Sequence, residues 1–294
     1  MKIILTGGSG FLGKTLQKNW ENKHEVLTLG RTVANSLIYD LSTQIPQLPP
    51  CDLIVHAAAK AHVIPKSAQE ENDFFQVNLV GTQNLLDGIV HLPKSLIFIS
   101  SVAVYGKEKG ELISEDHPLK ANTPYSKSKL EAERLVSDWG VHHQVPVLIL
   151  RLPLIVGDNA PGNLGAMLTA IRRGYYRRIS EGNARKSMVL AEDLAGSIPS
   201  WVGQSGVFNL TDGQNPTMAE LDSYLASKLG KKIKSMPGGI LRTLAKVGDL
   251  FPFFPFNSDR LAKLEYTLTF SDQKARRELG WSSRSVVGNF DPNL

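Results

Sequence analysis

The feature that most constrains this chain is a glycine-rich turn close to its first residue. The run Thr6-Gly7-Gly8-Ser9-Gly10-Phe11-Leu12-Gly13 lies between an apolar stretch, Lys2 to Leu5, and a helical stretch, Gly10 to Asn22. Glycines in such a place allow a tight turn, close approach of the backbone to a pyrophosphate, and close packing of helix on strand. The helix N-terminus adds free N–H groups and a favourable dipole for negative charge. This context predicts a dinucleotide-binding turn.

The first half of the chain alternates short apolar runs with helical stretches, which is typical of a doubly wound parallel α/β (Rossmann) sheet. The predicted strands are Lys2 to Leu5, Glu25 to Leu29, Leu53 to His56, Leu96 to Ser100 and Val147 to Leu150, and the predicted helices include Glu70 to Val90, Ser126 to Trp139 and Met218 to Leu229. The 294 residues exceed one ordinary core, so a second lobe is expected. We predict a dinucleotide-binding domain over 1–155, to which 187–212 returns through a strand within Ser187 to Gly196. A smaller C-terminal substrate-binding lobe is predicted over 156–186 and 213–294.

Composition excludes several other classes of protein. The lone Cys51 allows no intramolecular disulfide and indicates a cytoplasmic protein. No apolar stretch reaches the roughly 18 residues of a membrane span. The net charge of +5 is modest, and the arginine pairs at 172–173 and 177–178 are interpreted as a solvated face or an anion-binding rim, so no nucleic-acid partner is expected. We expect Gly239 to Phe256 to pack over the second lobe, the alternative being contact with a membrane surface. The histidines are scattered, and no metal site is expected.

The end of the second strand bears on the choice of cofactor. An acidic residue there binds the adenosine ribose of NAD, whereas a nearby arginine accommodates the 2′-phosphate of NADP. This chain has Gly30 followed by Arg31. The pattern favours NADP over NAD, although Arg31 as a solvated loop residue stays open.

A tyrosine and a lysine four residues apart are predicted to share one helical face, at Tyr125 and Lys129. Free tyrosine titrates at about pH 10. A cation held nearby stabilises the phenolate and lowers that pKa, so that proton transfer comes within range of neutral pH. Ser101, at the end of a predicted strand, is placed to hydrogen-bond the same substrate oxygen. These three residues are the predicted catalytic group of a hydride-transfer enzyme.

These motifs together resemble the extended short-chain dehydrogenase/reductases of the NAD-dependent epimerase/dehydratase family. The resemblance implies that Ser101, Tyr125 and Lys129 are the catalytic residues. It also implies cofactor contacts, which are listed as Gly7, Gly10, Phe11, Leu12, Gly13, Arg31, Asp40, Leu41, Ala57, Ala58, Ala59, Asn78, Tyr125 and Lys129. Within that set Asp40-Leu41 match the contact to adenine, and Asn78 matches a structural asparagine.

The same resemblance implies a nucleotide-sugar substrate held partly by the second lobe. Asn163-Leu164 resemble the contact to the substrate diphosphate. Lys186 occupies the register of a phosphate-binding arginine with Arg185 adjacent, so both are candidates. Arg260 is a further candidate phosphate ligand, and each cation could equally be an ordinary surface residue.

Three reactions are known on this scaffold. A 4,6-dehydratase needs an acid and a base just after the catalytic hydroxyl, where this chain has Val102 and Ala103. Dehydration is therefore not expected. The NADP-like pattern and the Ala59-Lys60-Ala61-His62-Val63 segment resemble enzymes that reduce UDP-4-keto-6-deoxy-N-acetylhexosamines. We expect a 4-reductase first and a UDP-sugar 4-epimerase second.

A different class, the non-catalytic dinucleotide sensor, is less consistent with the sequence. Such proteins usually lose the tyrosine or the lysine, and this chain keeps Tyr125, Lys129 and Ser101. A homodimer is common in the family that the chain resembles, but no segment of the sequence isolates an interface.

Overall fold

The computed structural model describes residues 1–61, 63–236, 239 and 265–292. Its centre is a seven-stranded sheet in the order β11-β7-β5-β4-β1-β2-β3, in which every pairing is parallel. The strands are β1 (Lys2–Thr6), β2 (Glu25–Gly30), β3 (Leu37–Ile38), β4 (Leu53–His56), β5 (Ser95–Ser101), β7 (Val147–Leu152) and β11 (Gly206–Asn209). The predicted α/β fold is thus confirmed. The strand order reverses between β1 and β4, and ligands of such sheets bind at that switch point, beyond the carboxyl ends of the strands.

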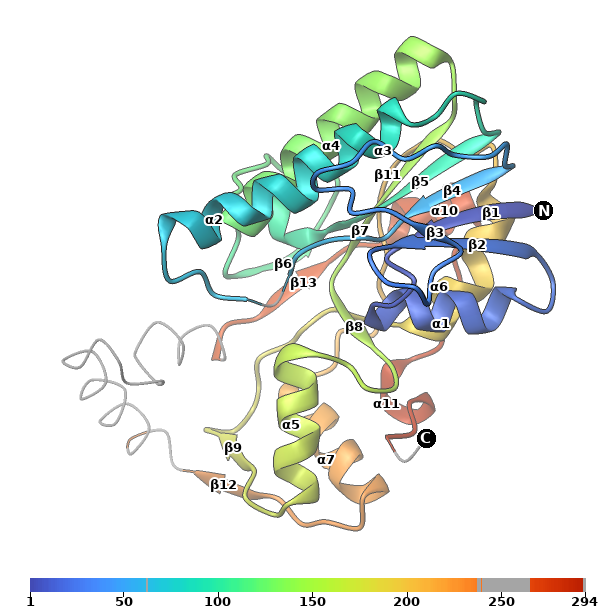
Figure 1. Cartoon of the computed structure of the whole chain (residues 1–294). Helices are drawn as coiled ribbons and strands as arrows, with labels where there is room; N and C mark the ends of the chain where they lie inside the picture. Colours follow the sequence, from blue (N-terminus) through green and yellow to red (C-terminus); the bar gives the residue numbers. More distant parts are fainter. Residues whose placement is uncertain (62, 237–238, 240–264, 293–294) are drawn as a thin grey trace.

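Helices cover both faces of this sheet (Figure 1). On one face lie α1 (Phe11–Trp20), α6 (Ala191–Ser197) and the short 3-10 helix η3 (Ile198–Trp201). Trp20 links α1 to α6 within this layer, because its indole Nε1 donates to the carbonyl of Ala195 at 2.7 Å. The other face carries α2 (Ala68–Phe75), α3 (Gly81–Asp87) and α4 (Pro124–His143). The sheet therefore lies between two helical layers, with an apolar core on each of its faces, as a doubly wound fold requires.

The helix predicted over Glu70 to Val90 is interrupted. Between α2 and α3 the chain makes a π-helical turn, η1 (Gln76–Val80). The turn holds Asn78 inside the protein, with its side chain bonded to Ser128 of α4. Such turns are frequent at functional sites.

The predicted return of Ser187 to Gly196 to the main sheet is wrong. Its strand β10 (Met188–Leu190) pairs instead with β8 (Leu154–Val156) in a separate two-stranded sheet. Pro153 has no N–H to donate, so the ladder of β7 ends there and the chain leaves the sheet. The strand that completes the main sheet is β11. Fifteen residues separate it from Leu190, the last residue of β10, and its first residue, Gly206, has a φ of 120°.

A smaller lobe lies beside the sheet domain (Figure 1). It contains α5 (Gly162–Arg172), α7 (Met218–Lys228), α11 (Val286–Asn289) and the paired strands β9 (Arg177–Ile179) and β12 (Lys234–Met236). Thr217 caps α7 through a reciprocal capping box with Glu220. Leu164, Leu168, Leu221 and Leu225 form the apolar contact between α5 and α7.

The predicted domain boundary over 213–294 needs a correction, because part of that segment belongs to the sheet domain. Strand β13 (Leu268–Phe270) pairs with β6 (Gly110–Ile113), which follows the 3-10 turn η2 (Val102–Tyr105). Helix α10 (Gln273–Leu279) places Ala275 in the main core, together with the following Trp281. Trp281 packs there against Trp201, with ring centroids 5.8 Å apart, whereas the preceding lobe has its own core.

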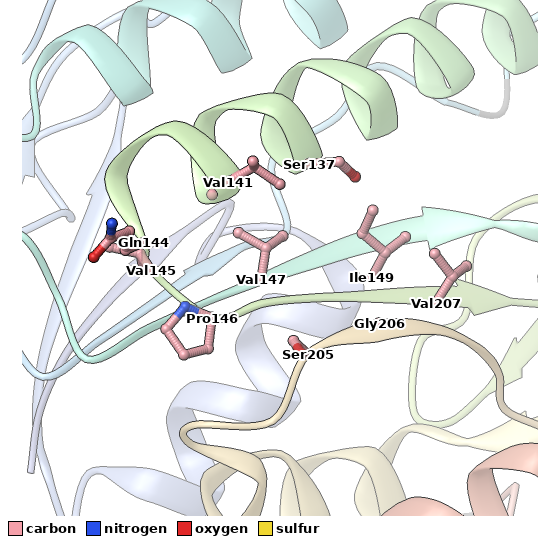
Figure 2. A pocket seen from close by; sticks show the side chains of 11 residues that line it. Ser137, Val141, Gln144, Val145, Pro146, Val147, Ile149, Ser205, Gly206 and Val207 are labelled. Carbon is pink, nitrogen blue, oxygen red and sulfur yellow. The ribbon is translucent and has the colours of Figure 1, made fainter.

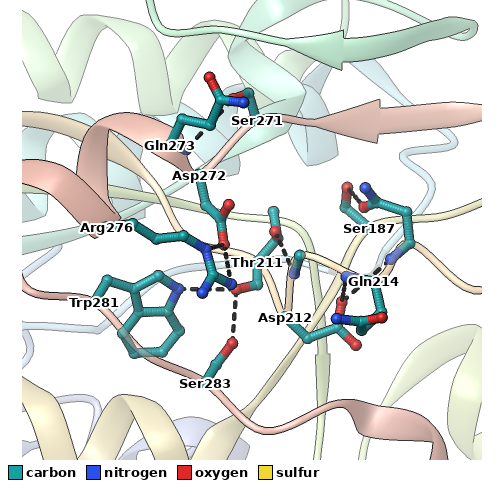
Figure 3. A network of polar contacts seen from close by, with 12 residues as sticks. Ser187, Thr211, Asp212, Gln214, Ser271, Asp272, Gln273, Arg276, Trp281 and Ser283 are labelled. Carbon is teal, nitrogen blue, oxygen red and sulfur yellow. Dashed lines mark hydrogen bonds and ion pairs between the residues drawn. The ribbon is translucent and has the colours of Figure 1, made fainter.

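Buried polar contacts hold this returning segment in place (Figure 3). The indole of Trp281 and the hydroxyl of Ser283 both donate to the carbonyl of Thr211, at 2.8 and 3.0 Å. The carboxylate of Asp212 accepts from the backbone N–H of Val286 at 3.0 Å. These bonds connect the sheet domain to α11 of the lobe.

Two sequence interpretations fall outside the described residues. They concern the segment 240–256, expected to pack over the lobe, and Arg260, expected to bind phosphate. Within the part of the chain that the structure does describe, no helix has the length and apolar character needed to cross a bilayer.

Candidate active site

The glycine turn is packed too closely for any side chain. A Cβ on Gly7 would lie 2.7 Å from the N of Ala58, and one on Gly13 would lie 2.1 Å from the O of Gly7. Gly7 also has a φ of 73°, which only glycine adopts readily. The backbone N–H of Gly10 closes the turn on the carbonyl of Gly7 at 2.9 Å. This bare backbone at the N-terminus of α1 fits the pyrophosphate of a dinucleotide.

A cleft of about 560 Å³ opens above the turn, at the carboxyl ends of β1, β2 and β4. It gathers many residues that the sequence singled out, namely Gly7, Gly10, Arg31, Asp40, Leu41, Ala57, Ala58 and Ala59. Three predicted cofactor residues lie behind this wall. Phe11 packs toward Gly157, Leu12 is 8% exposed in the main core, and Gly13 backs the turn. They support the cleft without lining it.

The end of the cleft near β2 lacks an acidic side chain at the strand terminus. A Cβ on Gly30 would lie 2.9 Å from Nδ2 of Asn35, whose amide is itself held by Thr32. The fold therefore leaves no room there for a carboxylate without displacing Asn35. Arg31 is exposed at the rim. The carboxylate of Asp40 accepts from the N–H and hydroxyl of Ser42 at 3.0 and 2.6 Å, so it stabilises its own loop.

The three predicted catalytic residues converge beside β5. Ser101 is its last residue, and Tyr125 lies in the first turn of α4, where the Ser101 hydroxyl is close enough to lower the pKa of the tyrosine. Thr123 caps this helix through a capping box with Ser126, and Pro124 occupies its first position. Lys129 is 2% exposed and donates to the carbonyl of Ile99 at 2.6 Å. Two hydroxyls and a buried lysine side chain thus lie near the carboxyl end of β5.

The effect of Lys129 on the pKa of Tyr125 stays a prediction. Burial raises that pKa, and the Ser101 hydroxyl is the influence that lowers it. The Nζ of Lys129 donates to the Ile99 carbonyl and lies 3.8 Å from the centroid of the Phe98 ring. Burial also lowers the pKa of Lys129 to about 7. In this state Tyr125 is protonated, which suits a proton donor.

Asn78 and His56 brace the floor of the site. The amide of Asn78 accepts from the N–H of Lys60 at 2.7 Å and donates to Ser128 at 2.9 Å, so it ties the segment after Ala59 to α4. His56 lies between the hydroxyls of Thr6 and Thr82, at 2.6 and 2.9 Å. Burial lowers the pKa of His56 to about 3, so this ring is a neutral structural group.

Two charged residues of the cleft were not among the predicted site residues. Lys60 Nζ pairs with the carboxylate of Asp73 at 2.6 Å, and both side chains line the cleft. The position of Lys60 directly after the predicted Ala57 to Ala59 was an available signal. Asp73 on α2 carried none, because its partner lies 13 positions away and across a turn.

Of the predicted substrate residues, Asn163, Leu164, Arg185 and Lys186 lie apart from this cleft. Asn163 is exposed and Leu164 is buried in the first turn of α5. The guanidinium of Arg185 donates to the carbonyl of Asn215 at 3.1 Å, and Lys186 Nζ donates to the carbonyl of Tyr266 at 2.7 Å. The structure places neither cation among the residues that line the cleft.

A second hollow lies at the opposite end of the sheet, between the C-terminal half of α4 and the edge strand β11 (Figure 2). Its volume is about 400 Å³, and its walls include Val141, Val147, Ile149 and Val207. No side chain in its lining can donate or accept a proton near neutral pH. The cleft above the glycine turn is therefore the better candidate for chemistry.

Known proteins agree with this assignment. Residues 3–198 match the NAD dependent epimerase/dehydratase family. The chain is 28% identical over 250 residues to the N-acetyl-alpha-D-glucosaminyl-diphospho-ditrans,octacis-undecaprenol 4-epimerase of Escherichia coli O157:H7, covering 80% of this chain and 74% of that protein. It is 27% identical over 246 residues to the GDP-6-deoxy-D-mannose reductase of Pseudomonas aeruginosa, covering 76% and 79%.

A solved structure shares the whole architecture. The UDP-N-acetylglucosamine 4-epimerase from Bacillus cereus superimposes with a TM-score of 0.77 at 21% identity, covering 97% of this chain and 94% of that one. At this identity the likeness concerns the fold, and the family match rests on the sequence. From the glycine cradle, the cleft and that match together, the chain belongs to the NAD-dependent epimerase/dehydratase family and is an NAD(P)-dependent enzyme of that family.

Proposed function

We propose that this protein reduces the 4-keto group of a nucleotide-sugar, most specifically a UDP-4-keto-6-deoxy-N-acetylhexosamine, with NADPH. The observation that carries the proposal is the convergence of Ser101, the last residue of β5, and Tyr125, in the first turn of α4, where the serine hydroxyl acts on the pKa of the tyrosine. A protonated hydroxyl at that place supplies what a carbonyl needs when it becomes an alcohol.

Each residue has a role in that step. When bound in the cleft, NADPH would supply the hydride for the carbonyl carbon. Tyr125 donates its proton to the carbonyl oxygen, and its raised pKa means that the donor is fully protonated at neutral pH. Ser101 hydrogen-bonds the same oxygen and orients it. Lys129, buried beneath the strand, holds the Ile99 carbonyl and so fixes the end of β5.

The preference for NADPH rests on the β2 end of the cleft. The strand ends at Gly30, with Asn35 packed against it and no ribose-binding carboxylate there, and exposed Arg31 lies at the rim. A guanidinium offers a phosphate two parallel N–H donors. This supports Arg31 as the ligand of a 2′-phosphate.

The substrate is proposed to reach from this site onto the lobe. Asn163 and Leu164 would face its diphosphate, with Arg185, Lys186 and Arg260 as further phosphate ligands. The reductase from Pseudomonas aeruginosa supports a keto-sugar substrate by similarity.

The second candidate is a 4-epimerase, which the relative from Escherichia coli supports. Dehydration is disfavoured, because the two residues after Ser101 are Val102 and Ala103 on the turn η2. An epimerase would oxidise C4 and return the hydride to the other face, so it would need no added reductant.

The test offers purified protein UDP-4-keto-6-deoxy-N-acetylglucosamine with either NADPH or NADH, and follows the loss of reduced cofactor. Stoichiometric consumption that is faster with NADPH supports the 4-reductase. If neither cofactor is consumed, but UDP-N-acetylglucosamine is converted to its C4 epimer, the reductase is refuted in favour of the epimerase. Tyr125→Phe, with cofactor binding followed separately, distinguishes an enzyme from a dinucleotide sensor.

A further inference from the structure

A buried ion pair lies directly behind the candidate catalytic residues. Glu133 of α4 and Arg151 of β7 are each 4% exposed, and Arg151 Nη2 lies 2.7 Å from Glu133 Oε2. The Nε of Arg151 also donates to both carboxylate oxygens, at 3.1 and 3.2 Å. The hydroxyl of Ser100 donates to the same carboxylate. Hydrogen bonds from two strands, β5 and β7, therefore hold the Glu133 carboxylate in place.

Each nitrogen of the guanidinium has a partner as well. Its Nη1 donates to the hydroxyl of Tyr105 at 3.0 Å, and that hydroxyl donates to Asn209 of β11 at 2.8 Å. Burying two charges costs more desolvation than it returns unless every hydrogen bond is satisfied, and such a pair is weak evidence for stability. The position of the Glu133–Arg151 pair suggests a role other than stability.

That use is indicated by Lys129, one helical turn before Glu133 on the same face of α4. Both side chains are almost fully buried, and they hold consecutive residues of β5. Lys129 bonds the carbonyl of Ile99, and Glu133 accepts from Ser100. The next residue in the strand is Ser101, whose hydroxyl meets Tyr125.

The groups around Lys129 differ in their charge and in their effect on its pKa. Burial lowers its pKa to about 7, and the carboxylate of Glu133 opposes that change. Of the other groups, His56 from β4 is neutral, and Tyr125 on the same helix is protonated. Arg151 from β7 and Tyr105 from η2 are both bonded into the ion-pair network.

We propose that Glu133 is a positioning residue: its carboxylate, held by Arg151 and Ser100, favours the charged form of the buried Lys129 amine and holds the end of β5 so that Ser101 faces Tyr125. The catalytic part of this statement rests on the proposed function, but the electrostatic part does not.

The charge of Lys129 can be followed without any substrate. Protein labelled with ¹³C-lysine is titrated by NMR, and the Lys129 signal is assigned as the one missing from Lys129→Met. In Glu133→Gln the midpoint of that titration should move to lower pH, because the opposing carboxylate is gone while the side chain keeps its shape. Glu131→Gln is the matched control, since it removes an exposed carboxylate from the same helix and should leave the midpoint in place. An unchanged midpoint in folded Glu133→Gln would overturn the proposal.

Glu133→Gln leaves Arg151 buried without a counter-charge, which destabilises the fold. The double variant Glu133→Gln/Arg151→Met removes that unpaired charge. We expect it to regain thermal stability while the Lys129 midpoint stays below that of the wild type. If stability and midpoint both return to wild-type values, the pair is only structural and the proposal is wrong.

Kinetics provides the second measurement. If the wild type turns over, the alkaline limb of its kcat profile should move to lower pH in both variants, with about tenfold lost in kcat at alkaline pH for each unit of displacement. An unmoved limb would refute the catalytic part. If the wild type turns over no offered substrate, the proposed function fails, and the NMR titration still decides the electrostatic part.

Discussion

Replacing Arg31 should weaken the binding of NADPH and leave the binding of NADH nearly unchanged. A hydrogen bond to a charged group contributes about 1.5–3 kcal/mol when it is sheltered. Arg31 is exposed at the rim of the cleft, where solvent and salt screen its charge, so about 1–2 kcal/mol is the reasonable range. That range corresponds to a rise of roughly 5- to 30-fold in the Kd for NADPH in Arg31→Ala.

The assay is a fluorescence titration of each reduced cofactor with wild type, Arg31→Ala and Arg134→Ala. Arg134 is an exposed arginine on α4 that is paired with Glu131, and its loss should change neither Kd. The effect of Arg31→Ala should shrink as salt is added, because the contact is electrostatic. Equal changes in Kd for NADPH and NADH would refute the role given to Arg31. NAD would then be as good a candidate cofactor as NADP.

Three further predictions concern the site and its floor. Tyr125→Phe should bind NADPH as the wild type does but lose roughly 10²–10⁴-fold in kcat, since it removes the proton donor; turnover within a few-fold of wild type would contradict this. Gly13→Ala should abolish cofactor binding, because its Cβ would lie 2.1 Å from the Gly7 oxygen, whereas Gly196→Ala meets nothing within 4 Å and should bind normally in the same titration. For His56, burial holds the native pKa at about 3 against an ordinary value of 6.5, so below about pH 6.5 the unfolded state binds a proton that the native state does not. Urea unfolding should therefore show the wild type losing up to about 1.4 kcal/mol per pH unit relative to His56→Gln between about pH 6 and pH 4, and parallel curves would show the assignment to be wrong.

The sequence alone determined the features whose physics is local. A strand, a glycine turn and a helix follow one another from Lys2 to Trp20, and the conformational freedom of glycine is a property of each position. The four-residue spacing of Tyr125 and Lys129 follows in the same way from the helical repeat. The parallel sheet was predictable as well, because its alternation of elements is written along the chain.

Tertiary structure decided what depends on partners far apart in sequence. Glu133 and Arg151 are 18 positions apart, and Tyr105 and Asn209 are 104 apart, so no local pattern announces the network behind the site. The pairing of β8 with β10 and the return of α10 to the main core likewise join segments that are far apart in the sequence.

The behaviour of Lys129 shows the difference most clearly. Spacing placed it on the same face of the helix as Tyr125, but burial, the Ile99 carbonyl and the carboxylate of Glu133 decide its direction and its charge. Desolvation and long-range electrostatics depend on the whole surroundings of a group, and these exist only once the chain is folded.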